Sequence, residues 1–189
     1  MAPMRARNGR RTIWMRLAVG VIGVAALATS APGQTRLAPY LATPADVVDR
    51  MLRLASVGPR DVVYDLGSGD GRIVIAAAKS FGARGVGIDI DAALVEQARA
   101  NAAAAGVGDR VIFRLEDAMT TDVSDATVVT LYLLAASNVK LRPHLQAQLR
   151  PGARIVAHNF GMGDWEPEKV ENFRDRGGAA RTLYLWTVR

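Results

Sequence analysis

The sequence predicts an α/β fold: a Rossmann-like sheet of seven strands, mostly parallel, with helices on both faces and an antiparallel C-terminal hairpin. Short apolar runs alternate with segments of helical periodicity through most of the chain, as they do in parallel sheets. A glycine-rich turn follows the first of these runs, in the stretch VVYDLGSGDGR at 62–72. Near the C-terminus, two extended segments flank Gly177-Gly178, which indicates a hairpin.

The expected elements begin at Thr43-Pro44, where a hydroxyl cap and a proline at the first helical position predict a helix that Gly58-Pro59 ends. Asp91 is expected to cap a later helix that continues through Ala105. Strands are expected at 62–65, 85–89, 111–115, 127–134, 154–158, 170–173 and 182–188. Further helices are expected at 73–81 and near 143–149.

Residues 1–36 have the pattern of a signal or membrane-anchor segment, and residues 37–189 are expected to form one domain. A basic region precedes the apolar stretch LAVGVIGVAALA at 17–28, which suits a signal-peptide core and is short for a spanning helix of about 20 residues. Cleavage and anchoring both stay open. The expected location is therefore membrane-associated or exported, with membrane association through residues 12–28 and the side of the membrane undecided.

The charge distribution argues against a nucleic-acid partner. The chain has a formal net charge of +6, but residues 1–36 hold six arginines and no acidic residue. Residues 37–189 are left with equal numbers of basic and acidic residues, whereas a nucleic-acid binder clusters its basic residues on the folded surface or in a dedicated arm. With no cysteine and two histidines, no metal site is expected.

The glycine turn lies where an open α/β sheet binds ligands, at the carboxyl end of a strand. Glycine lets the backbone approach a ligand closely because no Cβ intervenes. This turn has the form G-x-G-x-G, with Asp65 before it and Asp70 within it. Two carboxylates would repel a pyrophosphate and favour a ligand that carries positive charge, such as a sulfonium with an α-ammonium group.

Acidic residues also end the next two strands. Asp89 stands where a carboxylate can accept hydrogen bonds from ribose hydroxyls, and Glu116-Asp117 where one can accept from an adenine amino group. Taken singly, Asp89 or Asp117 could equally be a helix cap or a solvated loop acid. Jointly, the acids indicate S-adenosyl-L-methionine as the cofactor. The residues expected to bind it are Tyr40, Asp65, Gly67, Ser68, Gly69, Asp70, Gly71, Asp89, Ile90, Glu116, Asp117 and Ala118.

Four stretches carry a family resemblance: VVYDLGSGDGRIVIAAA, GVGIDID, DATVVTLYLL and HNFGMGDWEP. They resemble the class I, seven-strand methyltransferases, and more narrowly the small protein-lysine methyltransferases whose mitochondrial members modify ATP-synthase c-subunits and the adenine nucleotide translocase. The resemblance covers roughly residues 39–188. It implies that Asp65 and the three glycines surround the methionine moiety, that Asp89 holds the ribose, and that Asp117 holds the adenine. The chain departs from its relatives at Asp89, where they often have glutamate, and at Ala135, where they often have proline.

The acceptor side is expected to involve Tyr132, Asn138, His158 and Trp165. Tyr132 is the best candidate for lining an amine pocket, because an aromatic face attracts a cation. Each of the four also has a purely structural interpretation. Tyr132 could pack a strand end, Asn138 could cap a helix, Trp165 could cover a sheet edge, and His158 could be a hydrogen-bonded strand-end residue rather than a general base.

The leading hypothesis is an S-adenosyl-L-methionine-dependent N-methyltransferase that acts on a protein lysine, with membrane proteins among the candidate substrates. The domain expected at residues 37–189 is small and has no insertion that could cover a small molecule. This favours, as the methyl acceptor, a side chain that projects from a protein. Methylation of a small molecule or a lipid headgroup is the alternative, and a non-catalytic binding module of the same fold is the second. The sequence leaves the oligomeric state open.

Overall fold

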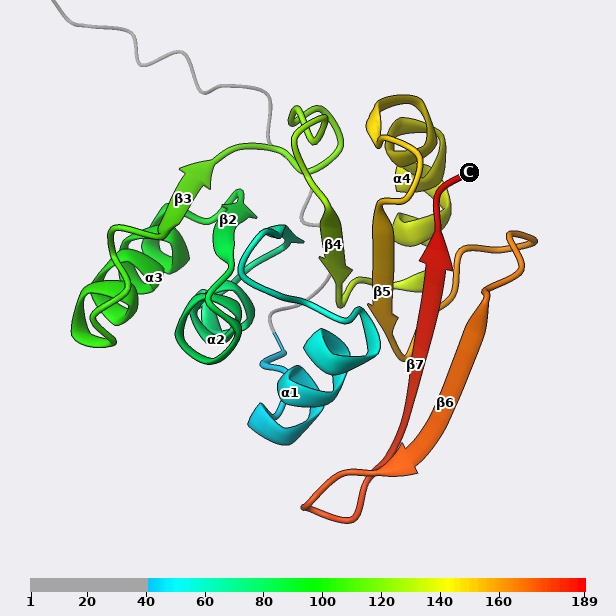
Figure 1. Ribbon diagram of the computed structural model, residues 1–189, viewed down its shortest axis with the longest axis horizontal. Coiled ribbons are helices and arrows are strands. Elements are labelled where there is room, and N and C mark those ends of the chain that lie inside the picture. Colours follow the sequence, from blue (N-terminus) through cyan, green and yellow to red (C-terminus); the bar gives the residue numbers. More distant parts are fainter. Residues whose placement is uncertain (1–40) are drawn as a thin grey trace, which may run out of the picture. The chain divides into compact units, whose positions relative to one another are not determined.

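The computed structural model describes residues 41–189, which form a seven-stranded sheet with four helices in that range (Figure 1). The strands are β1 Val62–Leu66, β2 Arg84–Asp89, β3 Val111–Leu115, β4 Val128–Leu131, β5 Arg154–His158, β6 Lys169–Arg174 and β7 Ala180–Thr187. The helices are α1 Ala45–Leu54, α2 Arg72–Phe81, α3 Ala92–Ala104 and α4 Ala135–Gln148.

The sheet has the order β3-β2-β1-β4-β5-β7-β6. The strands from β1 to β5 are parallel, whereas β7 is antiparallel both to β5 and to β6. The expected fold class, including the antiparallel C-terminal hairpin, is confirmed. Because the strand order reverses between β1 and β4, the carboxyl ends of these strands flank a crevice, the usual position of a ligand in such sheets.

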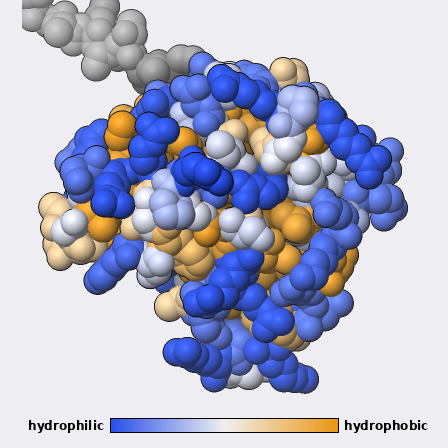
Figure 2. Space-filling model, in the orientation of Figure 1, coloured by the Kyte–Doolittle hydropathy of each residue, from blue (hydrophilic) through white to orange (hydrophobic). Residues whose placement is uncertain are grey.

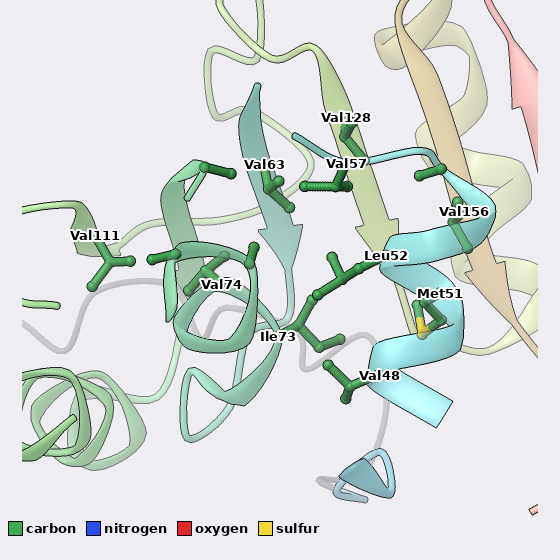
Figure 3. Close-up of a cluster of buried hydrophobic side chains, with 14 of the residues drawn as sticks. Val48, Met51, Leu52, Val57, Val63, Ile73, Val74, Val111, Val128 and Val156 are labelled. Carbon is green, nitrogen blue, oxygen red and sulfur yellow. The ribbon is translucent and has the colours of Figure 1, made fainter. Parts of the chain in front are cut away.

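Both faces of the sheet carry an apolar layer. On one face, α1, α2 and α3 bury side chains against the strands, and Figure 3 shows Met51 and Leu52 of α1 directed toward the sheet residues Val63 and Val156. On the other face, α4 and the segment before β4 pack against a second cluster that includes Leu131, Leu141 and Trp186. Burial on this scale is the main stabilising contribution to a domain of this size. The helices thereby hold the strand ends that form the crevice.

Two expected boundaries were wrong. The fourth strand ends at Leu131, and α4 begins at Ala135 rather than near Pro143, which lies inside the helix. The first turn of α4 forms because the carbonyl of Leu134 accepts hydrogen bonds from the amides of Ser137 and Asn138, at 2.9 and 3.0 Å. The run at 132–134, expected as strand, is therefore the connection that places Tyr132 beside the crevice.

The expected cap of the first helix was also wrong. The N-cap residue of α1 is Pro44, without a side-chain cap hydrogen bond, and Thr43 is buried. By contrast, Asp91 caps α3 as expected, because its carboxylate accepts from the amides of Ala93 and Leu94.

The expected membrane-associated or exported location needs correction. Within residues 41–189, no helix is both long enough and apolar enough to cross a membrane. Residues 12–28, which carried that expectation, and the rest of the 1–36 segment lie outside the described residues. Figure 2 shows one face of the described part, where hydrophilic side chains predominate and apolar ones lie between them.

Candidate functional site

A cleft opens at the carboxyl ends of β1, β2, β3 and β4. Its open space, including the part continuous with solvent, is about 770 Å³. The lining residues come from the segment before α1, the glycine turn, the first turns of α2 and α3, and the ends of these four strands with the residues that follow them: Leu41, Ala42, Thr43, Asp65, Gly67, Ser68, Asp70, Arg72, Ile73, Ile88, Asp89, Ile90, Leu94, Glu116, Ala118, Tyr132 and Leu133. The cleft thus combines carboxylates with apolar walls.

The glycine turn is built from backbone that other residues adopt only with strain. Gly67, Gly69 and Gly71 have φ values of +83°, +53° and +80°, which explains their alternate spacing. The amides of Gly67 and Ser68 donate to the carbonyl of Ile88 at 2.8 and 2.9 Å, so the turn is fixed to the end of β2. Gly67 and Ser68 line the cleft, whereas Gly69 and Gly71 are not among its lining residues.

Asp89 connects the end of β2 to the glycine turn and to the start of α3. Its Oδ2 accepts from the amide of Gly69 at 2.8 Å, and its Oδ1 accepts from the amide of Asp91 at 3.0 Å. Both oxygens are thereby oriented, and the half-buried carboxylate still faces the cleft. A preoriented carboxylate at this position suits a pair of ribose hydroxyls.

Asp65 is a buried carboxyl group at the end of β1. Its Oδ1 accepts from the hydroxyl of Thr130 at 2.8 Å. Burial, with further contributions from the charges of Asp89 and Asp70, raises the pKa of Asp65 to about 7, and the Thr130 hydrogen bond opposes this in part. A cationic group bound nearby would favour the ionised form and release the proton.

Asp70 does not present a free negative charge to the cleft, contrary to the sequence-based interpretation. Arg72 donates to it through two nitrogens, Nε to Oδ1 at 2.9 Å and Nη2 to Oδ2 at 2.6 Å. The remaining nitrogen, Nη1, donates to the carbonyl of Thr43 at 2.9 Å. The preference for a cationic ligand therefore depends on Asp65, Asp89 and the acid that follows β3.

The segment after β3 places Glu116 and Ala118 in the cleft. Asp117, expected to hold the adenine, is not among the lining residues, because its Oδ1 accepts from the amide of Met119 at 2.9 Å in a local turn. The Glu116 carboxylate accepts from the Thr121 hydroxyl at 2.5 Å. Of the two acids, Glu116 is the one that lines the cleft, and Ile90 lines it too. Tyr40 lies outside the described residues.

Only one of the four expected acceptor-side residues, Tyr132, lines the cleft. Asn138 is buried at the start of α4, where its Nδ2 donates to the carbonyl of Phe160 at 2.9 Å. Trp165 packs at 6.0 Å, centroid to centroid, from Trp186, whose indole nitrogen donates to the Trp165 carbonyl. Both residues therefore hold the segment after β5 in place and do not reach the cleft.

His158 lies behind Tyr132, with the two ring centroids 3.9 Å apart. The side chain is fully buried, and neither ring nitrogen has a hydrogen-bond partner within the described residues. Burial and the charge of Arg181 lower the pKa of His158 to about 4, with Asp175 opposing them. A neutral, enclosed imidazole with this pKa is a poor base for a lysine ammonium, so the geometry favours a supporting role for His158 over general base catalysis.

Replacing His158 with phenylalanine should stabilise the protein. The variant keeps an aromatic ring beneath Tyr132 and removes two buried unpartnered nitrogens, each of which costs about 1–3 kcal/mol. Because the folded-state pKa lies below the unfolded one, stability of the parent should fall as pH decreases from 6.5 to about 4. Thermal unfolding at several pH values should show a higher Tm for H158F and no such loss. A lower Tm for H158F at pH 7 would mean that the imidazole has a partner in solution.

Several cleft residues were not expected from the sequence. Leu41, Ile88, Leu94 and Leu133 supply apolar walls that no motif indicates, and their signal is only their position beside strand ends. Arg72 was within the quoted motif, but its role depends on a contact with Thr43, 29 residues earlier in the chain.

The cleft fits S-adenosyl-L-methionine by its chemistry. Asp65, Asp89 and Glu116 supply acceptors for an ammonium group, for hydroxyls and for an amino group, and the apolar walls can enclose a base. The Ser68 hydroxyl is buried in the lining and has no hydrogen-bond partner within the described residues. Such an orphaned polar atom indicates a ligand or an ordered water as its partner.

Comparisons with known proteins identify the family of this chain. A family model described as the ANTKMT methyltransferase domain matches residues 65–169. A protein-lysine N-methyltransferase of Saccharolobus islandicus is 42% identical over 151 residues, which cover 79% of this chain and 93% of that protein. The lysine N-methyltransferase of Mus musculus that is named for the ATP synthase c-subunit is 33% identical over 176 residues, covering 87% of this chain and 69% of that protein.

Solved structures support the same assignment. The crystal structure of a Salinibacter ruber protein described as an RNA methyltransferase, in complex with S-adenosyl-L-homocysteine, has 57% sequence identity and a TM-score of 0.74. The match covers 78% of this chain and 94% of that one. The chain belongs to the ANTKMT methyltransferase domain family and is an S-adenosyl-L-methionine-dependent methyltransferase.

Proposed function

We propose that the methyl acceptor is the side chain of a lysine in a protein. The observation that carries the proposal is the position of Tyr132, a half-buried aromatic ring that lines the same cleft as the donor-facing carboxylates. An aromatic face of this kind attracts a lysine ammonium group by cation–π contact. The Saccharolobus relative, a protein-lysine N-methyltransferase, supports the same acceptor.

The protein's own residues mainly bind and orient the reactants. The donor supplies a methyl group already activated by a sulfonium, so alignment of an in-line attack provides much of the acceleration. Asp65 and the glycine turn hold the methionine moiety, Asp89 the ribose, and Glu116 the adenine. The lysine must be neutral to attack, and the apolar walls of Leu41 and Leu133 favour the neutral amine because desolvation disfavours its charged form.

RNA is the second candidate acceptor, because the 57% identical Salinibacter protein is described as an RNA methyltransferase. The balanced charge of residues 37–189 argues against it, since RNA binding depends on basic residues that neutralise phosphates. A small molecule or lipid headgroup, and binding without catalysis, are the remaining alternatives.

Transfer of a radiolabelled methyl group to a lysate separates these acceptors. We expect label that protease removes and RNase leaves, and acid hydrolysis of the labelled protein should yield methylated lysine. Tyr132→Ala should reduce the transfer at least tenfold, whereas Tyr132→Phe, which retains the ring, should keep most of it. Label lost on RNase treatment, label confined to an organic extract, or no label despite donor binding would each contradict lysine methylation.

Donor binding should strengthen as pH rises through about 7. Asp65 has a raised pKa in the free protein, so below that pH the donor's ammonium must displace a proton from it. Calorimetry at pH 6.5 in buffers of different ionisation enthalpy should detect proton release on binding of S-adenosyl-L-homocysteine. Asp65→Asn should bind more weakly and without proton release. Identical heats of binding in all buffers for the parent would show that binding releases no proton, which would contradict a contact between the donor's ammonium group and protonated Asp65.

A further inference from the structure

Arg72 is the one basic side chain among the described residues that line the cleft. As the first residue of α2, it lies directly after the glycine turn. Its guanidinium joins two parts of the cleft, the carboxylate of Asp70 in the turn and the carbonyl of Thr43 before α1. All three contacts are 2.9 Å or shorter, which is good hydrogen-bond geometry.

The contact with Thr43 concerns the wall of the cleft. Leu41, Ala42 and Thr43 all line it, and they precede α1 rather than belonging to a helix or strand. The Arg72 hydrogen bond at 2.9 Å links this wall to the start of α2, directly after the glycine turn. Thr43 is buried, so its carbonyl would lose a strong partner if the guanidinium were removed.

The contact with Asp70 concerns the charge of the cleft. Two parallel N–H donors facing one carboxylate form the most specific kind of ion pair. The Asp70 side chain is only 15% exposed, so the pair is partly protected from solvent, although Arg72 itself is 38% exposed. The negative charge of Asp70 contributes to the raised pKa of Asp65, and the guanidinium lies where it compensates that charge.

We propose that Arg72 is a positioning residue of the donor cleft, which compensates the charge of Asp70 and holds the wall at residues 41–43 against the glycine turn. The inference concerns the donor side of the enzyme and holds whichever acceptor is methylated. Asn101 of α3 supports the same turn from behind, since its Nδ2 donates to the Asp70 carbonyl at 2.9 Å. The turn is therefore held from both sides, and Arg72 provides the contact on the cleft side.

Within residues 41–189, the charged and titratable groups that line the cleft together with Asp65 come from several elements. They are Asp89 at the end of β2, Asp70 and Arg72 of the turn and α2, Glu116 after β3, and Tyr132 after β4. The wall at residues 41–43 adds no titratable side chain. The titration of Asp65 therefore reports on whether Arg72 compensates Asp70.

The test uses the protein without donor first. Carbon-13 NMR of the carboxyl groups would follow the titration of Asp65 in the parent, Arg72→Gln, Asp70→Asn and the double variant. We expect Arg72→Gln to move the midpoint upward by about 0.5 pH unit, because Asp70 is left uncompensated. In the double variant, the titration midpoint of Asp65 should lie close to its midpoint in Asp70→Asn. A merely structural role for Arg72 would not produce this pattern.

Calorimetry with S-adenosyl-L-homocysteine then tests whether ligand binding depends on the contact between Arg72 and the wall at residues 41–43. Arg72→Gln should weaken binding about tenfold, and the double variant should stay weak because the Thr43 carbonyl still lacks its partner. Arg72→Lys should fall between parent and Arg72→Gln, since an ammonium cannot contact both groups with a planar fork. Arg99→Gln is the matched control. Arg99 also pairs with a carboxylate, that of Glu96, and donates to a backbone carbonyl, that of Phe113, but it does not line the cleft. The affinity of Arg99→Gln for S-adenosyl-L-homocysteine should stay within about twofold of the parent.

Two results would overturn the proposal. Arg72→Gln with an unchanged Asp65 midpoint and an affinity within about twofold of the parent would show that Arg72 is dispensable. Recovery of full affinity in the double variant would show that the wall does not depend on Arg72. Neither result depends on methyl transfer, so failure of this proposal is distinguishable from failure of lysine as the acceptor.

Discussion

Asp89→Asn should weaken the binding of S-adenosyl-L-methionine by about 100- to 1000-fold, the largest effect we expect from one substitution in the cleft. The two oxygens of the carboxylate each accept a backbone N–H, from Gly69 and from Asp91. An asparagine has only one acceptor oxygen, and its NH₂ group would face the other amide. Either the glycine turn or the start of α3 therefore loses its anchor, and the ribose hydroxyls lose a charged acceptor as well.

Calorimetry with the donor and with S-adenosyl-L-homocysteine measures this loss. Asp91→Asn is the matched control, two residues away, because asparagine caps helices about as well as aspartate does. The Asp91 carboxylate accepts from the amides of Ala93 and Leu94, and Asp91 is not among the residues that line the cleft. The affinity of Asp91→Asn for the donor should therefore stay within about twofold of the parent. Equal affinities for Asp89→Asn and Asp91→Asn would remove Asp89 from the donor site.

Gly71→Ala should lower the free energy of unfolding by about 2–5 kcal/mol, the largest stability loss we expect. Its φ of +80° costs a residue with a Cβ about 1–2 kcal/mol. The added Cβ would also stand 2.5 Å from Phe113 Cζ and 3.0 Å from the Cβ of Ala98, and overpacking of this kind costs about 1–3 kcal/mol. A fall in Tm of roughly 10 °C is expected for a domain of this size.

Gly106→Ala separates the two contributions. Gly106 has a similar φ of +70°, but a Cβ built there meets nothing within 4 Å, so only the backbone strain remains. Thermal or urea unfolding should show a clearly smaller loss for Gly106→Ala, and Phe113→Leu should recover part of the stability of Gly71→Ala. If the two glycine variants lose the same stability, the proximity of Phe113 to the turn has no energetic consequence.

The sequence was sufficient for the sheet and for the position of the glycine turn because both depend on local patterns. Apolar runs, turn glycines and strand-end acids are all visible within a few residues, and Asp65 and Asp89 lie where their positions at strand ends place them. Even so, a glycine turn carries two kinds of requirement that the sequence does not separate. Gly67 lines the cleft, whereas Gly71 makes room for Phe113.

The errors arose where the outcome depends on distant contacts. The apolar run at 132–134 continues the strand pattern of β4 but forms a connection, and α4, which contains Pro143, buries Leu141 and Leu145 in the core. Arg72 could not be paired with Thr43 from the sequence, because the contact depends on how α1 packs. His158 and Asn138 were expected near the acceptor from their positions along the chain. Whether the His158 side chain points into the cleft depends on strand alternation and on its neighbour Tyr132, and Asn138 is instead buried against the carbonyl of Phe160.

The position of β7 between β5 and β6 has a consequence during protein synthesis. The strand that completes the hydrogen bonds of β5 is translated after β6, so a nascent chain carries an open, apolar β5 edge until residues 180–187 leave the ribosome. In the finished protein, the outer strand β6 exposes charged residues such as Lys169 and Arg174, which discourage edge-to-edge aggregation. The unfinished sheet lacks that protection on β5, so translation stalled before residue 180 should produce chains that aggregate or recruit chaperones.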